Sequence, residues 1–241
     1  MFLVLLSWSG GKDSALALQA LRSDSSVKVA GLLTTVSGEY RRISHHGVRE
    51  ELLDRQAGAI GLPLDKMYLP AGPGDGPCTN EQYERLIADT LARHQAAGVT
   101  HIAHGDLFLA DLRAYRERNL AKMGLKGLFP LWGQNTRGLY LRFVAEGFKA
   151  YTCCVEGNLG REFVGRLLDE TFLRDLPAGI DPCGENGEYH SFVFDGPIFQ
   201  RTLPTRVGKI VCREGRYYAD LLPEDALPDT DPRIPPVGTA T

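Results

Sequence analysis

The sequence predicts an α/β protein in which a parallel sheet covered by helices is followed by a smaller C-terminal α/β lobe. Short apolar segments alternate with helix-forming segments through the first part of the chain, and this is the pattern of βαβ units. A glycine pair connects the first strand to the first helix. We therefore expect two lobes, at 1–128 and 129–227, and a flexible tail at 228–241 whose prolines oppose a packed element.

The first lobe is predicted to alternate strands and helices. Segments rich in β-branched residues and leucine mark the strands at 2–8, 27–36, 66–69 and 100–104. Helices are expected between and after them, at 12–22, 46–60, 79–97 and from Asp111 on. Gly61 is placed to end the second helix, and Thr79 with Gln82 forms a capping box that starts the third.

The pattern changes in the second lobe. A turn followed by a short apolar stretch is expected at 124–132, with a soft boundary between the lobes near Phe129. Beyond it, the sequence predicts helices at 137–146 and 162–175, and strands at 149–155 and 189–194.

Composition and charge argue against several classes of function. The 241 residues carry a formal charge of −3, whereas binding to DNA or RNA usually shows as a broad basic face. The apolar run at 2–6 is too short for a signal peptide and is expected to be a buried strand of a cytoplasmic protein. No apolar run approaches the length of a membrane span. The five cysteines form no C-x-x-C pair, which favours reduced, mostly buried thiols.

The sequence S-W-S-G-G-K-D-S at 7–14 joins the first strand to the first helix. Gly10 and Gly11 lack a Cβ, so the backbone can turn its N–H groups toward an anion. The first turn of the helix adds unpaired donors, and Lys12 adds a mobile positive charge. This segment, which we call the phosphate loop, is predicted to bind phosphate groups.

Three polar side chains accompany the glycine pair. Ser9 and Ser14 can donate hydrogen bonds to phosphate oxygens or help to position a metal ion. Asp13 would repel the phosphates unless it bound a cation or capped the helix, so Mg²⁺ at Asp13 is a hypothesis. The alternative, a surface turn with a glycine and a lysine, is disfavoured by the strand before it and the helix after it.

Ligands of open parallel sheets bind at the carboxyl ends of the strands, so the loops after the second and fourth strands are expected to join the site. After the fourth strand, Gly105 permits close backbone approach and Asp106 can bind a ribose or a metal ion. His104 is expected to be a hydrogen-bonded structural histidine. The loop after the second strand is either solvated or contacts pyrophosphate and substrate through Arg41, Arg42, His45 and His46.

The segment 181–188, which we call the acidic loop, is the densest polar motif of the second lobe. Glycines flank Glu185 and Asn186, and Glu188 follows on the same side of the next strand as His190. Tyr189 is expected on the opposite side. Two carboxylates, an amide and a histidine suit the recognition of a polar ligand, whereas a hairpin-like surface turn is the alternative.

The S-G-G-K-D-S core of the phosphate loop resembles the PP-loop of the N-type ATP pyrophosphatases. The P-loop of other NTPases, G-x-x-x-x-G-K-[ST], does not occur in the chain. The phosphate loop, Gly105-Asp106, Arg113 with Glu117, the 124–132 segment and the acidic loop follow one another as they do in the diphthine–ammonia ligase family. The resemblance covers about residues 2–200 and implies a HUP-like (Rossmann-like) nucleotide-binding domain. The family often has E-G-G-E-x-E-T where this chain has E-N-G-E-Y-H-S.

The resemblance implies an enzyme that uses ATP and Mg²⁺ to adenylate a carboxylate, and that lets ammonia displace AMP. The carboxylate could belong to a protein side chain such as diphthine on elongation factor 2. We expect Lys12, Asp13, Glu185 and Glu188 to be catalytic, with the second lobe folding the acidic loop over the phosphate loop. The implied nucleotide-binding residues are Ser9, Gly10, Gly11, Lys12, Asp13, Ser14, Gly105 and Asp106. The implied substrate-binding residues are Arg113, Glu117, Asn186, Tyr189 and His190.

Two other functions are compatible with the phosphate loop. The chain could be a PP-loop enzyme that acts on another small molecule or on tRNA, although neither a basic RNA-binding lobe nor a cysteine pair is visible in the sequence. It could also be a sensor that binds ATP without turnover. The ligase would release AMP and pyrophosphate, whereas a sensor would bind ATP and release no pyrophosphate.

Overall fold

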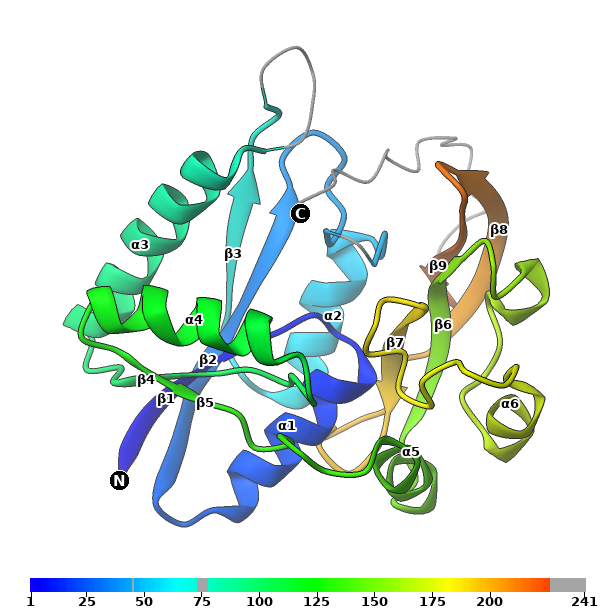
Figure 1. The fold of residues 1–241 in the computed structure, drawn as a ribbon, viewed down its shortest axis with the longest axis horizontal. Coiled ribbons are helices and arrows are strands. Elements are labelled where there is room, and N and C mark those ends of the chain that lie inside the picture. The colour runs from blue at the N-terminus through cyan, green and yellow to red at the C-terminus, as the bar shows by residue number, and fades with distance from the viewer. Residues whose placement is uncertain (45, 73–77, 226–241) are drawn as a thin grey trace.

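The computed structural model describes residues 1–44, 46–72 and 78–225, and it contains two β-sheets that lie beside each other (Figure 1). The first sheet is parallel and has the strand order β3-β2-β1-β4-β5. The predicted parallel sheet is therefore confirmed. Its strands are β1 (Phe2–Ser7), β2 (Val27–Ser37), β3 (Leu64–Leu69), β4 (His101–Ala103) and β5 (Lys126–Leu128).

The edge strand β5 was not predicted, because the 124–132 segment was expected to hold only a turn and an apolar stretch. In the structure His101 of β4 pairs with Lys126, and Ala103 pairs with Leu128. A strand of three residues is too short to show the alternation of side chains that identifies a strand in a sequence. Pairing with β4, rather than local pattern, makes this segment extended.

Helices cover both faces of the parallel sheet. On the face toward the second sheet lie α1 (Lys12–Ser23) and α2 (Glu50–Ile60), and on the opposite face lie α3 (Asn80–Ala96) and α4 (Ala110–Lys122) (Figure 1). The predicted capping box starts α3, since the Thr79 side chain accepts from the Gln82 N–H and the Gln82 side chain accepts from the Thr79 N–H.

The helix α2 ends at Gly61 as predicted, with φ of 76° at this glycine, but it begins at Glu50 rather than at 46. Two β-bridges, Val36 with Ile43 and Arg42 with Arg49, hold the preceding loop in an extended conformation. The apolar pattern continues into this loop, yet the bridges delay the start of the helix.

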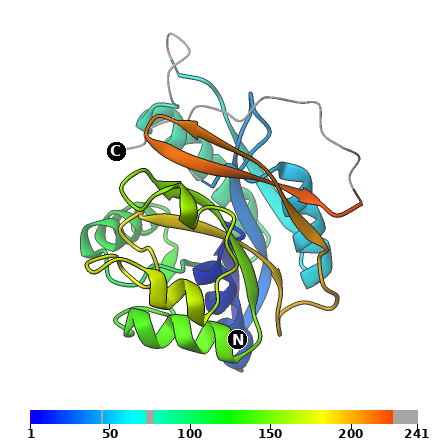
Figure 2. The same ribbon diagram turned by 90° about the vertical axis from the view of Figure 1, so that its right-hand side faces the viewer.

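The second sheet is antiparallel, with the strand order β7-β6-β9-β8. Figure 2 shows the orange β8–β9 hairpin, which the sequence analysis did not predict, extending along this sheet. Two helices, α5 (Thr136–Ala145) and α6 (Glu170–Asp175), complete the lobe. The strands are β6 (Lys149–Glu156), β7 (Tyr189–Asp195), β8 (Thr205–Arg213) and β9 (Arg216–Pro223).

The helix predicted over 162–175 is wrong in its first half. Only a 3-10 turn, Arg161–Phe163, and the short α6 are helical in this region. Between them Gly165 has φ of 77°, and Leu167 forms a β-bridge with Tyr151 of β6. A left-handed glycine and pairing to a neighbouring strand override a helical pattern of apolar residues.

The two lobes share one hydrophobic core, which contains Leu6 and Trp8 from the first lobe together with Phe192 and Leu221 from the second. All five cysteines are free, and three of them are buried, as expected for packing thiols. In the described part of the chain no helix is both long and apolar enough to cross a membrane. The predicted tail at 228–241 and His45 lie outside the described residues.

Candidate active site

The phosphate loop connects the carboxyl end of β1 to α1 and is enclosed by the second lobe. Gly10 has φ of 77°, a conformation that favours glycine, and a Cβ on it would come 2.9 Å from Gln56 Oε1. The backbone N–H of Val193 in β7 donates to Gly10 O at 2.9 Å, and Gln56 Nε2 donates to the same oxygen at 3.0 Å. The loop conformation is therefore fixed by contacts from α2 and from the second lobe.

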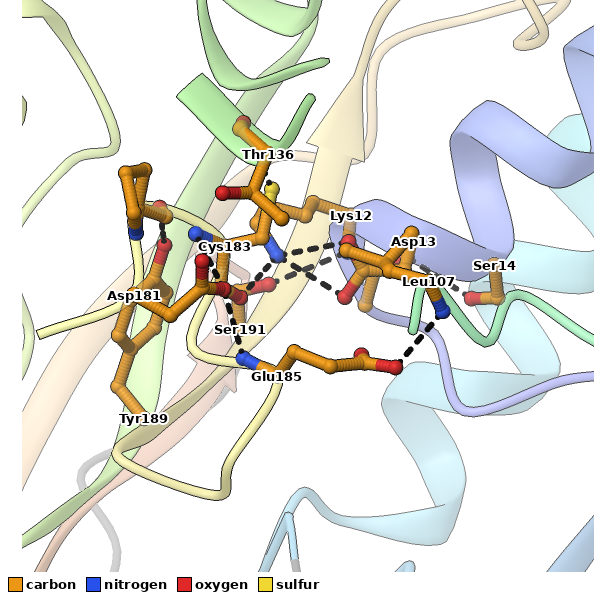
Figure 3. A network of polar contacts seen from close by, with 12 residues as sticks. Lys12, Asp13, Ser14, Leu107, Thr136, Asp181, Cys183, Glu185, Tyr189 and Ser191 are labelled. Atoms are coloured by element: carbon orange, nitrogen blue, oxygen red, sulfur yellow. Dashed lines mark hydrogen bonds and ion pairs between the residues drawn. The ribbon is translucent and has the colours of Figure 1, made fainter. Parts of the chain in front are cut away.

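Lys12 is buried, with 1% of its side chain exposed, and its ammonium group points into the junction between the lobes (Figure 3). The Nζ atom donates to both Asp13 oxygens, at 2.8 and 2.9 Å, and to the backbone oxygen of Cys183 in the acidic loop. Burial is the largest single influence and opposes the charge, but Asp13, Cys183 and Glu185 together raise the pKa of Lys12 above its usual value. Lys12 therefore carries a positive charge inside the protein.

Glu185 of the acidic loop reaches across to the first lobe. Its Oε1 accepts a hydrogen bond from the N–H of Leu107, which follows β4, at 2.7 Å (Figure 3). Asp181 holds the loop in this position, because its Oδ2 accepts from the N–H groups of Cys183 and Glu185, each at 3.0 Å. Burial is the main cause that raises the pKa of Glu185 to about 7, and the nearby negative charge of Asp13 adds to it.

Glu188 has a different position from Glu185, although both were predicted to act together. Its carboxylate accepts from the N–H of Asp181 at 3.1 Å, the N–H of Asn186 at 3.0 Å and the Asn186 side-chain amide at 2.9 Å. Both oxygens are thus engaged within the acidic loop. Sequence periodicity could not reveal this, because the loop folds back onto its own last residue.

A small cavity of about 120 Å³ lies between the phosphate loop and the acidic loop. Ligand pockets usually have about 300–1,000 Å³, so this space accommodates the reactive groups rather than a whole nucleotide. The cavity brings together residues of the phosphate loop and of the acidic loop, which belong to different lobes. It is lined by Ser9, Gly11, Lys12, Asp13, His46, Gly184, Glu185, Gly187, Tyr189, His190 and Ser191.

Ser191 is a contact that the sequence analysis did not assign to the site. Its Oγ accepts a hydrogen bond from the backbone N–H of Lys12 at 3.1 Å, and its backbone oxygen lies 3.2 Å from His46 Nδ1. The expected alternation along β7 was the available signal, since it placed Ser191 on the same side as Tyr189. The ring of Tyr189 lies 5.4 Å from Lys12 Nζ.

The residues after β4 pack against the backbone of the phosphate loop. A Cβ on Gly105 would come 2.9 Å from the backbone carbon of Asp13, so glycine is required for this close approach. Asp106 forms an ion pair with Arg116 at 2.8 Å and does not line the cavity. His104 is buried as expected, but neither ring nitrogen has a hydrogen-bond partner among the described residues. The expectation of a hydrogen-bonded histidine was therefore wrong, and burial holds its pKa well below the usual value.

The proposed substrate residues of α4 lie outside the cavity. Arg113 pairs with Glu117 at 2.9 Å, and its guanidinium stacks 4.7 Å from the ring centres of both Phe129 and Trp132. These contacts attach α4 to the segment that leads into the second lobe. Asn186 is likewise held within the acidic loop.

The donor set at Asp13 fits a magnesium ion that is bound mainly through phosphate oxygens. Among the described residues no group of three or more histidine, cysteine, aspartate or glutamate side chains could hold a metal by itself. Mg²⁺ commonly uses one or two carboxylates together with substrate phosphates and water. Asp13 lines the cavity and can supply one such carboxylate.

In the loop after β2, the two arginines form ion pairs away from the cavity, whereas His46 lines the cavity. Arg41 pairs with Glu50 at 2.7 Å, and Arg42 forms a buried ion pair with Asp220 of β9 at 2.9 Å. Neither arginine lines the cavity, whereas His46 does. Of the described candidates in this loop, only His46 is brought to the phosphate loop.

The structure has the features of a Rossmann-like nucleotide-binding protein. It has a parallel sheet, a glycine–lysine phosphate loop after the first strand, and a second lobe that covers this loop. Family models described as the N-terminal and C-terminal domains of diphthamide synthase match residues 3–127 and 136–220. The chain belongs to the diphthamide synthase family, and the predicted family is confirmed.

Curated relatives agree with the family models. A protein of Bos taurus named diphthine–ammonia ligase is 25% identical over 235 residues, which cover 88% of this chain and 85% of the relative. A Homo sapiens protein of the same name has the same identity and coverage. A Danio rerio protein of that name is 27% identical over 216 residues, covering 81% of this chain and 83% of the relative.

Proposed function

We propose that this protein is an ATP-dependent carbon–nitrogen ligase that adenylates a carboxylate and then transfers ammonia to it. The observation that carries the proposal is the pairing, inside one cavity, of the buried Lys12 on the phosphate loop with the Glu185 carboxylate from the second lobe. The relatives named diphthine–ammonia ligase support this reaction class. The proposed partners are ATP, ammonia and a carboxylate such as diphthine on elongation factor 2.

The chemistry requires activation, because ammonia cannot displace oxide from a carboxylate. In the first step a carboxylate oxygen attacks the α-phosphorus, the bond to the β-phosphate oxygen breaks, and pyrophosphate leaves. In the second step ammonia attacks the acyl carbon of the adenylate and AMP leaves. The negative charge that develops on the departing pyrophosphate calls for fixed donors, which the loop N–H groups and Lys12 supply. Mg²⁺, held at Asp13 when bound, would neutralise phosphate charge.

Lys12 must exchange partners in this scheme. Its ammonium group binds Asp13 and the Cys183 oxygen in the structure, and phosphate oxygens would compete for the same donors. The charged Lys12 ammonium group can exchange the Asp13 carboxylate for oxygens of the departing pyrophosphate. We infer that nucleotide binding thereby loosens the contact between Lys12 and the acidic loop.

Glu185 is suited to accept the proton that ammonium must lose before it attacks. A pKa of about 7 allows this carboxyl group to take up and release a proton near neutral pH. The proton leaves ammonium for Glu185, and the nitrogen lone pair becomes available for the acyl carbon. Closure of the cavity by the second lobe would keep water from the adenylate.

The products of the reaction test the proposal. We expect wild-type protein, incubated with Mg-ATP, ammonium chloride and elongation factor 2 that carries diphthine, to form AMP, pyrophosphate and the amide. Lys12→Ala should abolish pyrophosphate release. Lys149→Ala is the matched control, because this lysine is 56% exposed and, in the described part of the chain, pairs only with the half-buried Asp195 at 3.1 Å.

Other outcomes would favour other functions. Formation of ADP instead of AMP would reject the reaction. Release of AMP that depends on tRNA rather than on the carboxylate would favour a tRNA-modifying PP-loop enzyme. Binding of ATP without turnover, with every acid tested, would favour a sensor. We place the reaction in the cytoplasm as part of the same proposal.

A further inference from the structure

His46 lies directly on the phosphate loop. It comes from the loop between β2 and α2, and a Cβ built on Gly11 would be only 3.2 Å from His46 Cε1. The ring lines the same cavity as Gly11 and Lys12. A histidine that is not adjacent in sequence to the glycine pair thus forms one wall of the predicted phosphate site.

The hydrogen bond between the His46 ring and the backbone oxygen of Ser191 determines which ring nitrogen carries a proton. His46 Nδ1 lies 3.2 Å from the backbone oxygen of Ser191. A carbonyl oxygen can only accept, so Nδ1 must be the donor in this contact. The Nε2 atom is bonded to Cε1, the ring atom that faces Gly11. In the neutral ring Nε2 is an acceptor, and in the charged ring it is a second donor.

The charges around the cavity favour the donor form when an anion is present. Asp13 and Glu185 place two carboxylates at the cavity, so a positive group in addition to Lys12 would offset more of the charge of a polyphosphate. The ring of His190 lies 4.6 Å from that of His46, centre to centre, and the thiol of Cys153 lies 4.0 Å from His46 Nδ1. Two charged imidazoles at this separation would repel each other, and a bound anion reduces that cost.

We propose that His46 completes the phosphate site by donating a hydrogen bond from Nε2 to the β- or γ-phosphate oxygens of the nucleotide, and to pyrophosphate after cleavage. The proposal rests on the proposed ATP-dependent function. It assigns His46 as a binding residue whose ring takes up a proton from solvent at Nε2 when the anion binds, and passes no proton to the nucleotide. Ser191 and Gly11 orient the ring, and Nε2 is the atom that acts.

Two substitutions separate this role from a structural one. His46→Asn keeps a donor near the position of Nδ1, so it can maintain the contact with Ser191, but it removes Nε2. His46→Gln places an amide near the position of Nε2 and loses the Nδ1 contact. His94→Asn is the control, because His94 lies on α3 and contacts Asp65 at 2.8 Å, away from the cavity.

Calorimetric titration with inorganic pyrophosphate and with Mg-ATP provides the test. We expect His46→Asn to weaken pyrophosphate binding by roughly 10- to 100-fold, the usual effect of losing a charge-assisted hydrogen bond. His46→Gln should retain part of the affinity, and His94→Asn should match wild type. In wild-type protein the nitrogen-15 resonance of His46 Nε2 should shift from the acceptor to the donor range when pyrophosphate binds.

The failure of this inference can be told apart from the failure of the proposed function. If wild type binds pyrophosphate and ATP but His46→Asn binds them equally well, His46 has no role in phosphate binding. An Nε2 resonance that does not move on binding would lead to the same conclusion. If wild type binds neither compound, the ATP-dependent function itself is rejected.

Discussion

A buried ion cluster joins the lobes beside the active site, and its removal gives a sharp prediction. Asp220 of β9 accepts from Arg42 Nη1 at 2.9 Å, from Arg49 Nε at 2.9 Å and from Arg49 Nη2 at 2.7 Å. The exposed fractions are 6% for Asp220, 5% for Arg42 and 22% for Arg49. Both arginines belong to the loop that carries His46, so the cluster anchors this loop to the second lobe.

Asp220→Ala would remove the carboxylate from the buried ion pair and leave Arg42 charged and buried. Removing one member of a buried ion pair costs about 3–5 kcal/mol, mainly because the remaining charge stays desolvated. Arg42 would keep its hydrogen bond to the Gly47 oxygen at 2.7 Å, and the more exposed Arg49 can turn toward water. For a protein of this size each kcal/mol lowers the melting temperature by about 2–4 °C, so we expect a decrease of ~6–20 °C.

Urea unfolding followed by circular dichroism measures the loss of unfolding free energy, and Asp225→Ala is the matched control. Asp225 also pairs with an arginine, Arg55, at 2.8 Å, but the two side chains are 71% and 38% exposed. Such a surface pair contributes about 0–1 kcal/mol. Equal destabilisation by the two substitutions, or a change below about 1 kcal/mol for Asp220→Ala, would refute the reasoning from burial.

Two further predictions concern stability. The pKa of Glu185 is raised from 4.5 to about 7, so the folded state holds its proton more tightly and the carboxyl group lowers the unfolding free energy as pH rises through this window. The unfolding free energy of Glu185→Gln should equal that of wild type below pH 4.5 and exceed it by about 1–2 kcal/mol at pH 8, after allowance for solvent screening. Urea midpoints that differ equally at both pH values would contradict this prediction. Thr79→Ala should cost about 1 kcal/mol in thermal unfolding, because it removes the capping box of α3, and an unchanged melting temperature would show that the cap is not needed.

Local rules predicted most of the first lobe, apart from β5 and the start of α2. An apolar run, a glycine pair and a helix-forming segment define the phosphate loop, because backbone freedom at glycine and the dipole of a helix act over a few residues. The capping box at Thr79 and the glycine stop at Gly61 were identified for the same reason. Alternation of strands and helices then implied the parallel sheet.

The same local rules could not assign the segments whose conformation depends on a distant partner. The strand β5 is extended because it pairs with β4, and the stretch around Gly165 is non-helical because it pairs with β6. The β8–β9 hairpin is likewise stabilised by the edge that β6 offers to β9. Pairing of this kind depends on neighbours in space and leaves little trace in sequence periodicity.

A phosphate loop after a parallel strand and an acidic loop in a second lobe could be predicted from the amino-acid sequence, because each motif is local. Which polar groups share the cavity depends on how the two lobes pack against each other. Lys12 meets the Cys183 oxygen across 171 residues of chain, and His46 meets Ser191 across 145. Glu185 and Glu188 are three positions apart, yet one faces the first lobe and the other folds into its own loop. Spacing along the chain controls only local geometry, whereas packing between the lobes controls which distant side chains come into contact.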